Sequence, residues 1–177
     1  MMNESPQNWT RTAVWLHAIM LALFAMMFFL AYTWDFAHGA TKHAMIDLHK
    51  SVGVLIVMVA LVRLAWMLTH KGPRPIGTPS QQKAALGVHH LLYLLMFLMP
   101  FSGYVMVMMH GKPVSFFGLF DLPVLFQAHP AWKEFSEGVH TVLADIILVL
   151  VGGHGALAIY HHVVLKDETL RRMNPFS

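Results

Sequence analysis

The stretch GVHTVLADIILVLVGGHGALAIYHH, residues 138–162, is almost entirely apolar and carries a histidine towards each end. It exceeds the roughly 20 residues that a helix needs to cross a bilayer. His140 and His154 lie 14 residues apart in the sequence. In a helix, steps of about 100° and 1.5 Å per residue put their imidazoles within about 40° of each other and about 21 Å apart along the axis. The stretch therefore predicts a membrane-spanning helix with two histidines on one face, one near each membrane surface.

The composition of the whole chain is also typical of a membrane protein. Only 12% of its 177 residues are charged and 56% are hydrophobic, with a mean hydropathy of +0.55, whereas about a quarter of the residues in a soluble domain are charged. The net charge of +3 is small and its basic residues are spread out, which argues against a nucleic-acid partner. The lack of cysteine excludes disulfides, thiolate metal sites and covalent attachment of a c-type haem.

Four apolar windows are long enough to cross a bilayer, and they set the expected fold class. We expect an all-α integral membrane protein, a four-helix transmembrane bundle that forms a single domain over residues 1–177. The windows cover about 13–32, 47–68, 86–109 and 138–162. The first window is long for a signal peptide and no small-residue cleavage site follows it, so we expect a retained helix.

The basic residues predict the orientation of the bundle, because cytoplasmic loops of membrane proteins are enriched in Lys and Arg. With both termini in the cytoplasm, the outer side holds four basic residues, Lys42, Lys50, Lys112 and Lys133. The inner side then holds eight: Arg11, Arg63, Lys71, Arg74, Lys83, Lys166, Arg171 and Arg172. This distribution favours a multi-pass protein with both termini in the cytoplasm.

Histidines on other helices match the two on the last span in depth. His17 lies early in the first span, which runs outwards, and His49 lies early in the second, which runs inwards. We therefore expect an inner pair, His17 with His154, and an outer pair, His49 with His140. Single histidines in membrane helices can be packing residues, but ionisable groups at this depth are costly and usually functional.

Two facing imidazoles suit a haem iron better than zinc. Zinc takes about four protein or solvent ligands, whereas a porphyrin supplies four nitrogens and leaves two axial positions for histidine. Gly152, Gly153 and Gly155 beside His154, and Gly53 after His49, leave room for a flat macrocycle, although glycines also serve helix packing. We expect two non-covalent b-type haems.

Several segments of the chain resemble the bacterial cytochrome b561 family of small di-haem membrane cytochromes, and together they cover nearly its whole length. They are WLHAIM (15–20), DLHKSVGVLIVMVALVRLAWM (47–67), HHLLYLLMFLMPFSGY (89–104), HGKPVSFFG (110–118), GVHTVLA (138–144) and HGALAIYHHVVLKDETLRRM (154–173). The resemblance implies haem iron ligation by His17, His49, His140 and His154. It also implies electron exchange with the quinone pool, with superoxide oxidation coupled to ubiquinone reduction as one form of the reaction.

Further residues on the inner side are candidates for haem and quinone contacts. Arg63 lies 14 residues after His49, at the level of the inner pair, where it can bind a haem propionate or extend to the headgroups. Four histidines near the inner surface can supply protons to a quinone or simply reach water: His89, His90, His161 and His162. The tail LKDETLRRM, 165–173, is a basic segment expected to meet anionic headgroups.

On the outer side, Lys112 and Lys133 can attract a small anion such as superoxide, or can be solvated lysines. The apolar stretch SFFGLFDLPVLF in the long loop 110–137 suggests a cover lying on the bundle or on the lipid. Asp145 is an acidic residue inside the last span, off the histidine face, and it is either a proton relay or a carboxyl that is protonated or hydrogen-bonded nearby.

Three functions remain open from the sequence. The first is a di-haem electron carrier that takes electrons from superoxide or another periplasmic donor and exchanges them with ubiquinone. The second is a cytochrome b subunit that anchors a larger redox enzyme, although short tails leave it little docking surface. The third is a histidine-based metal transporter, which needs carboxylates and histidines that converge near the middle of the membrane, and only Asp145 qualifies.

Overall fold

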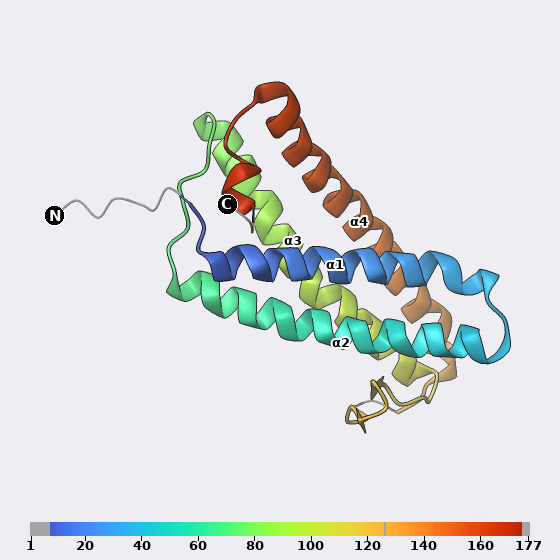
Figure 1. Cartoon of the computed structure of the whole chain (residues 1–177). Helices are drawn as coiled ribbons and strands as arrows, with labels where there is room; N and C mark the ends of the chain where they lie inside the picture. Colours follow the sequence, from blue (N-terminus) through green and yellow to red (C-terminus); the bar gives the residue numbers. More distant parts are fainter. Residues whose placement is uncertain (1–7, 126, 175–177) are drawn as a thin grey trace.

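Four long helices dominate the computed structural model, which describes residues 8–125 and 127–174 (Figure 1). They are α1 (Arg11–Thr33), α2 (Gly39–Thr69), α3 (Pro79–Met109) and α4 (Lys133–Tyr160). Each is long and apolar enough to cross a membrane. This confirms the prediction of an all-α protein with four transmembrane helices, since helices satisfy their own backbone hydrogen bonds within hydrocarbon.

The helices extend beyond the apolar windows that predicted them. α2 begins at Gly39 rather than near residue 47, and α4 begins at Lys133 rather than near residue 138. Hydropathy detects only the part of a helix that can lie in lipid, whereas the backbone hydrogen bonds continue into the polar flanks. The loop expected over 110–137 is correspondingly shorter.

Side chains cap the N-termini of two of the helices. Thr10 accepts a hydrogen bond from the backbone amide of Ala13 at 3.3 Å at the start of α1. At the start of α3, Thr78 and Gln81 form a reciprocal capping box, and Pro79 occupies the first turn. These bonds satisfy amides that have no partner within the helix, and they end the 71–80 linker at Thr78.

The helices pack in the order α1 on α2, α2 on α3 and α3 on α4. In Figure 1, α4 runs alongside α3 and diverges from α1 towards its own C-terminal end. The central hydrophobic cluster comes from the first three helices and comprises Met20, Leu23, Val52, Ile56, Ala60 and Met96. The two helices that carry the predicted inner pair, α1 and α4, are therefore not held together by this cluster.

A small hairpin covers one end of the bundle. Strands β1 (Ser115–Phe116) and β2 (Phe120–Asp121) pair antiparallel, and Phe117 and Gly118 in the turn both have positive φ, as a tight hairpin turn requires. Buried Ser51 of α2 accepts a hydrogen bond from the Phe117 amide at 2.9 Å and donates one to the Asp47 carbonyl at 2.9 Å. The apolar loop thus lies on the bundle, tied to α2 near His49.

The opposite end of the bundle holds both ends of the described chain. After α4, one π-helical turn, η3 (His161–Leu165), leads to Lys166 in the left-handed conformation with φ 53°. The chain then turns back, and the short helix η4 (Arg171–Met173) lies near the start of α1 (Figure 1). We call this the terminus end and the other the hairpin end.

Candidate functional site

Four histidines form two opposed pairs, one towards each end of the bundle. His17 of α1 faces His154 of α4 with ring centroids 6.1 Å apart, and we call them the terminus pair. His49 of α2 faces His140 of α4 with centroids 6.5 Å apart, and we call them the hairpin pair. The rings are steeply inclined to each other, by 74° and 76°. The partners expected from depth and helical phase alone are therefore neighbours in the structure.

The spacing within each pair suits one metal ion bound between the two rings. An imidazole nitrogen binds a transition metal at about 2 Å and lies about 1.1 Å from its ring centroid, so two axial imidazoles have centroids about 6.2 Å apart. The observed 6.1 and 6.5 Å are close to that value. Among the residues that the structure describes, no group of three or more His, Asp or Glu is arranged to hold a metal. Each pair can therefore supply only two ligands.

Hydrogen bonds orient His140 in the hairpin pair. The Ser102 hydroxyl donates to the Met99 carbonyl at 2.7 Å and lies 3.0 Å from Nδ1 of His140. Because the hydroxyl proton is already used, Nδ1–H of His140 is the donor in the second bond. Its Nε2 then keeps the lone pair that a metal requires, and such a partner on the other ring nitrogen is usual for metal-binding histidines.

A ring contact positions His49, in contrast to the hydrogen bond that orients His140. Its ring lies edge-on to the Trp34 indole with centroids 5.0 Å apart. Its Nδ1 is buried and has no hydrogen bond partner among the residues that the structure describes. The Met27 backbone carbonyl is close enough to interact with this ring. A buried imidazole nitrogen without a hydrogen bond partner costs free energy. This cost is consistent with a ring whose tautomer changes when its other nitrogen binds a ligand.

A glycine on α3 makes room for His140. A Cβ atom at Gly103 would lie 2.7 Å from Cε1 and 3.1 Å from Nδ1 of His140. Only a residue without a side chain lets the ring take this position. By contrast, an added Cβ at Gly152, Gly153 or Gly155 would meet no heavy atom of the described chain within 4 Å, apart from chain neighbours and the backbone of its own helix. The backbone around His154 therefore borders open space.

The terminus pair has a cation and a third histidine beside it. Nη1 of Arg63 lies 2.7 Å from Nδ1 of His17, and its guanidinium lies 5.8 Å from the centre of the Tyr93 ring. The His89 ring on α3 meets His154 with centroids 5.4 Å apart. Since a guanidinium only donates, Nδ1 of His17 accepts here and the proton of the neutral ring is on Nε2. Arg63 must therefore turn away before His17 can bind a metal through Nε2.

The proposed proton donors at the terminus end do not form one cluster. His89 contacts His154, whereas His90 and His162 are exposed. Within residues 8–125 and 127–174, no hydrogen bond or ring contact joins His90 to His161 or His162. The sequence placed these histidines at one depth, but depth does not determine their position around the bundle.

His161 instead pairs with an acid from the segment that follows α4. Its Nδ1 lies 2.6 Å from Oδ2 of Asp167, and the other carboxylate oxygen accepts from the Thr169 amide at 2.9 Å. The π-helical turn and left-handed Lys166 bring this carboxylate back over the imidazole. Both side chains are mostly buried, with 23% and 22% exposure. The result is an imidazole oriented by a carboxylate, an arrangement that can pass a proton from the other ring nitrogen.

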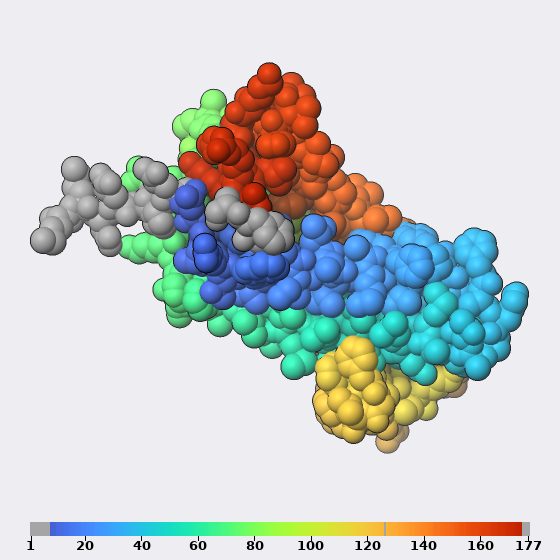
Figure 2. All heavy atoms as spheres, viewed as in Figure 1, coloured from blue at the N-terminus to red at the C-terminus, as the bar shows by residue number. Residues whose placement is uncertain are grey.

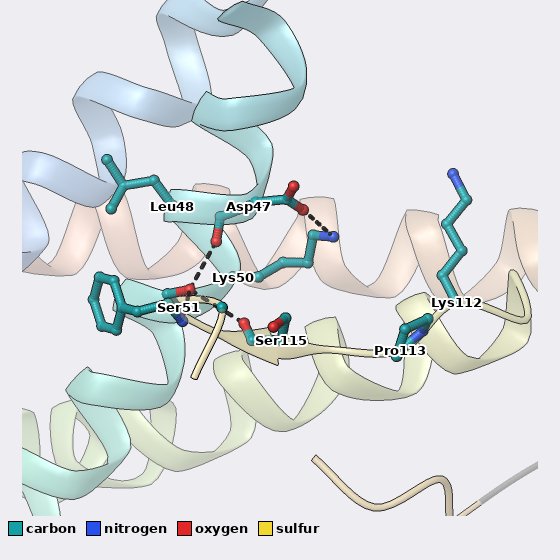
Figure 3. Close-up of a pocket in the computed structure, with 9 residues that line it drawn as sticks. Asp47, Leu48, Lys50, Ser51, Lys112, Pro113 and Ser115 are labelled. Carbon is teal, nitrogen blue, oxygen red and sulfur yellow. Dashed lines mark hydrogen bonds and ion pairs between the residues drawn. The ribbon is translucent and has the colours of Figure 1, made fainter. Parts of the chain in front are cut away.

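A pocket of about 490 Å³ lies at the hairpin end between α2 and the segment 112–118 (Figure 3). Its walls come from α2 around Ser51 and from the segment 112–118. Figure 3 shows Lys50 directed at Asp47, to which it forms an ion pair at 2.7 Å, while Lys112 extends separately. The Lys112 amine has no partner among the residues that the structure describes, so the pocket carries an unneutralised positive charge. Lys133 is half-buried at the start of α4, outside this lining.

Asp145 lies on the exposed face of α4 and has no partner among the described side chains. A carboxylate that faces hydrocarbon without a partner is costly. The proton-relay interpretation gains no support from its surroundings, because none of the four paired histidines contacts it.

Sequence reasoning missed three of the residues that shape this site. Ser102 and Gly103 were part of the quoted segment 89–104, but nothing in their spacing showed that they meet His140. Asp167 was assigned only to a basic tail. The one available signal was the pattern of a histidine pair followed by an Asp and a Thr, HHVVLKDET, which is consistent with a capping turn but does not reveal the π-helical geometry.

Comparison with known proteins gives a consistent result. A family described as prokaryotic cytochrome b561 matches residues 8–175. Cytochrome b561 homolog 2 of Escherichia coli strain K12 is 38% identical over 165 residues, covering 90% of this chain and 85% of the relative. Cytochrome b561 homolog 1 of the same strain is 28% identical over 173 residues, 95% of this chain and 97% of the relative. The probable superoxide oxidase CybB of Yersinia pestis is 31% identical over 130 residues, 72% and 73% of the two chains.

The Asp167–His161 contact predicts an unusual titration. Partial burial raises the pKa of the Asp167 carboxyl, but the hydrogen bonds from His161 and Thr169 outweigh it and lower the pKa from 3.8 to about 2. The contact therefore stabilises the fold above the ordinary pKa, and this stability is lost as the pH falls from about 4 through about 2. Carbon-13 NMR of the Asp167 carboxyl should show this low midpoint, and His161→Gln should move it back towards 3.8. An unchanged midpoint in His161→Gln would contradict the assignment.

Proposed function

The chain belongs to the prokaryotic cytochrome b561 family, and from that premise we propose that it is a di-haem b cytochrome that transfers electrons across the bacterial inner membrane to or from the quinone pool. The observation that carries the proposal is the presence of two opposed imidazole pairs, each spaced for one axially ligated iron. Membership of the family implies a membrane cytochrome with b-type haem. We propose in addition that there are two haems, that the four paired histidines ligate them, and that electrons are exchanged with quinone.

The residues present fit two b-type haems. The terminus pair, His17 and His154, would hold one, and the hairpin pair, His49 and His140, would hold the other. Bound haem supplies an iron centre that accepts and donates one electron at a time. The protein would contribute the four histidine nitrogens that hold the irons, and the hydrogen bond with Ser102 sets the tautomer of His140. The open space beside Gly152, Gly153 and Gly155 supports room for a macrocycle near His154.

Arg63 is proposed to pair with a haem propionate at the terminus end. With Nε2 of His17 holding the iron, the proton of the imidazole would be on Nδ1, and Arg63 could not donate to that nitrogen. The released guanidinium stays close to the pair and needs an anionic partner, because no carboxylate contacts it among the described residues. A propionate meets this need with two parallel charge-assisted hydrogen bonds.

The distribution of Lys and Arg supports an orientation with both termini in the cytoplasm. The hairpin end then faces the periplasm, and the pocket that contains Lys112 opens on that side. One relative carries the name probable superoxide oxidase. We therefore propose superoxide as the donor, drawn to the hairpin end by the unpaired Lys112 charge.

The reaction needs protons at the quinone. Two superoxide anions each lose one electron to become dioxygen, and one quinone takes up the two electrons together with two protons to become a quinol. His161 is the proposed proton donor at the terminus end, oriented by Asp167. His90 and His162 are exposed on the same end and are proposed to exchange protons with water.

Replacing one axial ligand should remove one haem selectively. We expect His154→Ala to purify with about half the haem of the parent protein, while the hairpin-end haem stays reducible. The complementary variant His140→Ala should keep the other haem, so the two difference spectra should sum to that of the parent. His162→Ala, eight residues further along the chain, is the control and should retain both haems. Full haem occupancy in His154→Ala would refute the ligand assignment.

Gly103→Ala should disturb the hairpin-end haem alone. The new methyl group would overlap the His140 ring, and overpacking of this kind costs about 1–3 kcal/mol, which corresponds to roughly five- to 150-fold weaker haem binding. Gly87→Ala on the same helix is a matched control, because nothing lies within 4 Å of its added Cβ. Haem titration of the apoprotein measures both variants. Equal affinities in the two variants would show that His140 needs no space at Gly103.

The direction of electron flow can be tested by stopped-flow spectroscopy. Superoxide should reduce the haems of the purified protein, and added ubiquinone should reoxidise them. Lys112→Gln should slow the superoxide step and weaken its dependence on salt, because one steering charge is lost. Haems that remain oxidised with superoxide but are reduced by quinol would reverse the proposed direction.

A further inference from the structure

A second cavity, of about 250 Å³, lies at the terminus end where the start of α1 meets η4. Three arginines line it, Arg11 from α1 and Arg171 and Arg172 from η4, and we call it the arginine cavity. In Figure 2 the red end of the described chain lies near the blue start of α1. Two segments about 160 residues apart in sequence thus bring their positive charges together.

The charge of the arginine cavity is largely unneutralised. Its lining contains no carboxylate among the described residues, and Arg11 is exposed with no ionic partner among them. Arg171 pairs with Glu168 at 3.0 Å, but both side chains are more than half exposed, so water screens the pair. Arg172 is half-buried and donates to the Arg74 carbonyl at 3.1 Å, which leaves its net charge intact.

Tryptophans place the cavity at the depth of lipid headgroups. Trp9 lines the cavity, and its ring lies so close to Gly72 that an added Cβ there would come within 2.4 Å. The indole N–H of Trp66 donates to Thr10 at 2.9 Å, one residue before Arg11. Tryptophan is enriched where hydrocarbon meets headgroups, so the arginines lie where phosphates of the bilayer lie.

We propose that the arginine cavity binds the phosphate diester of an anionic phospholipid. Guanidinium groups bind phosphate oxygens through two parallel hydrogen bonds, and Arg11 is also the first residue of a 23-residue helix, whose N-terminus favours an anion. The cavity volume suits a headgroup rather than a large ligand.

The surface next to Arg11 favours a lipid over free phosphate. Trp15 and Ile19 follow Arg11 at intervals of four residues, so they lie on the same side of α1. They are 46% and 45% exposed. An acyl chain attached to a phosphate in the cavity can extend along this apolar stripe, whereas inorganic phosphate gains nothing from it.

Native mass spectrometry of the haem-loaded protein in mild detergent tests the proposal, using phosphatidylglycerol and phosphatidylcholine as probes. We expect the parent protein to retain phosphatidylglycerol in preference to phosphatidylcholine. The double variant Arg11→Gln/Arg172→Gln should bind phosphatidylglycerol at least about tenfold more weakly, the loss expected from removing charged hydrogen bonds. Lys83→Gln removes one positive charge at the same end but outside the cavity, and it should bind as the parent does.

Further controls test whether the double variant is folded and whether the cavity binds lipid or free phosphate. Haem absorbance and gel filtration establish that the double variant is folded. Inorganic phosphate at millimolar concentration should not displace the lipid, and displacement would assign the cavity to a soluble phosphate instead. Equal loss of binding in Lys83→Gln would show a diffuse charge effect and overturn the proposal. Because the readout is lipid binding, its outcome is independent of the proposed electron transfer.

Discussion

The arrangement of imidazoles depends on one constraint, that hydrocarbon offers no hydrogen bond partners to a backbone. The chain satisfies this constraint with four helices whose backbone bonds are internal. Once the helices alternate in direction across a slab of fixed thickness, the position of a residue along its helix becomes a depth. His17, early in α1, and His154, late in α4, then lie at one depth because these two helices run in opposite directions. His49 and His140 lie at another depth because both come early in helices, α2 and α4, that run in the same direction.

The two pairs differ in what holds them. The hairpin pair is enclosed by Trp34, Ser102 and Gly103, and the hairpin bound to Ser51 covers that end. The terminus pair is more open, since the hydrophobic cluster comes from α1, α2 and α3 and does not include α4. Arg63 occupies the space next to His17. A bound cofactor would therefore contribute more to the cohesion of α1 and α4 at the terminus end than at the hairpin end.

Charge is organised differently at the two ends of the bundle. At the hairpin end, Lys112 lines a pocket and its amine has no partner within the described part of the chain. At the terminus end the segment after α4 makes two different contacts. Asp167 orients His161, and a few residues later Arg171 and Arg172 lie next to the start of α1. The left-handed Lys166 makes this possible because it reverses the chain immediately after the π-helical turn. The same short segment thus links the proposed proton donor to the proposed lipid site.

The sequence by itself determined the helices, their number and the pairing of the histidines, because hydropathy and helical phase are local properties and depth follows from them. It could not place Ser102 and Gly103 against His140, separate His90 from His161, or bring Asp167 over His161. These contacts depend on how each helix is rotated about its axis and on one left-handed residue after α4, and only packing in three dimensions sets either of them. Likewise, Arg11 lines one cavity with Arg171 and Arg172 only because the fold brings the start of α1 next to η4.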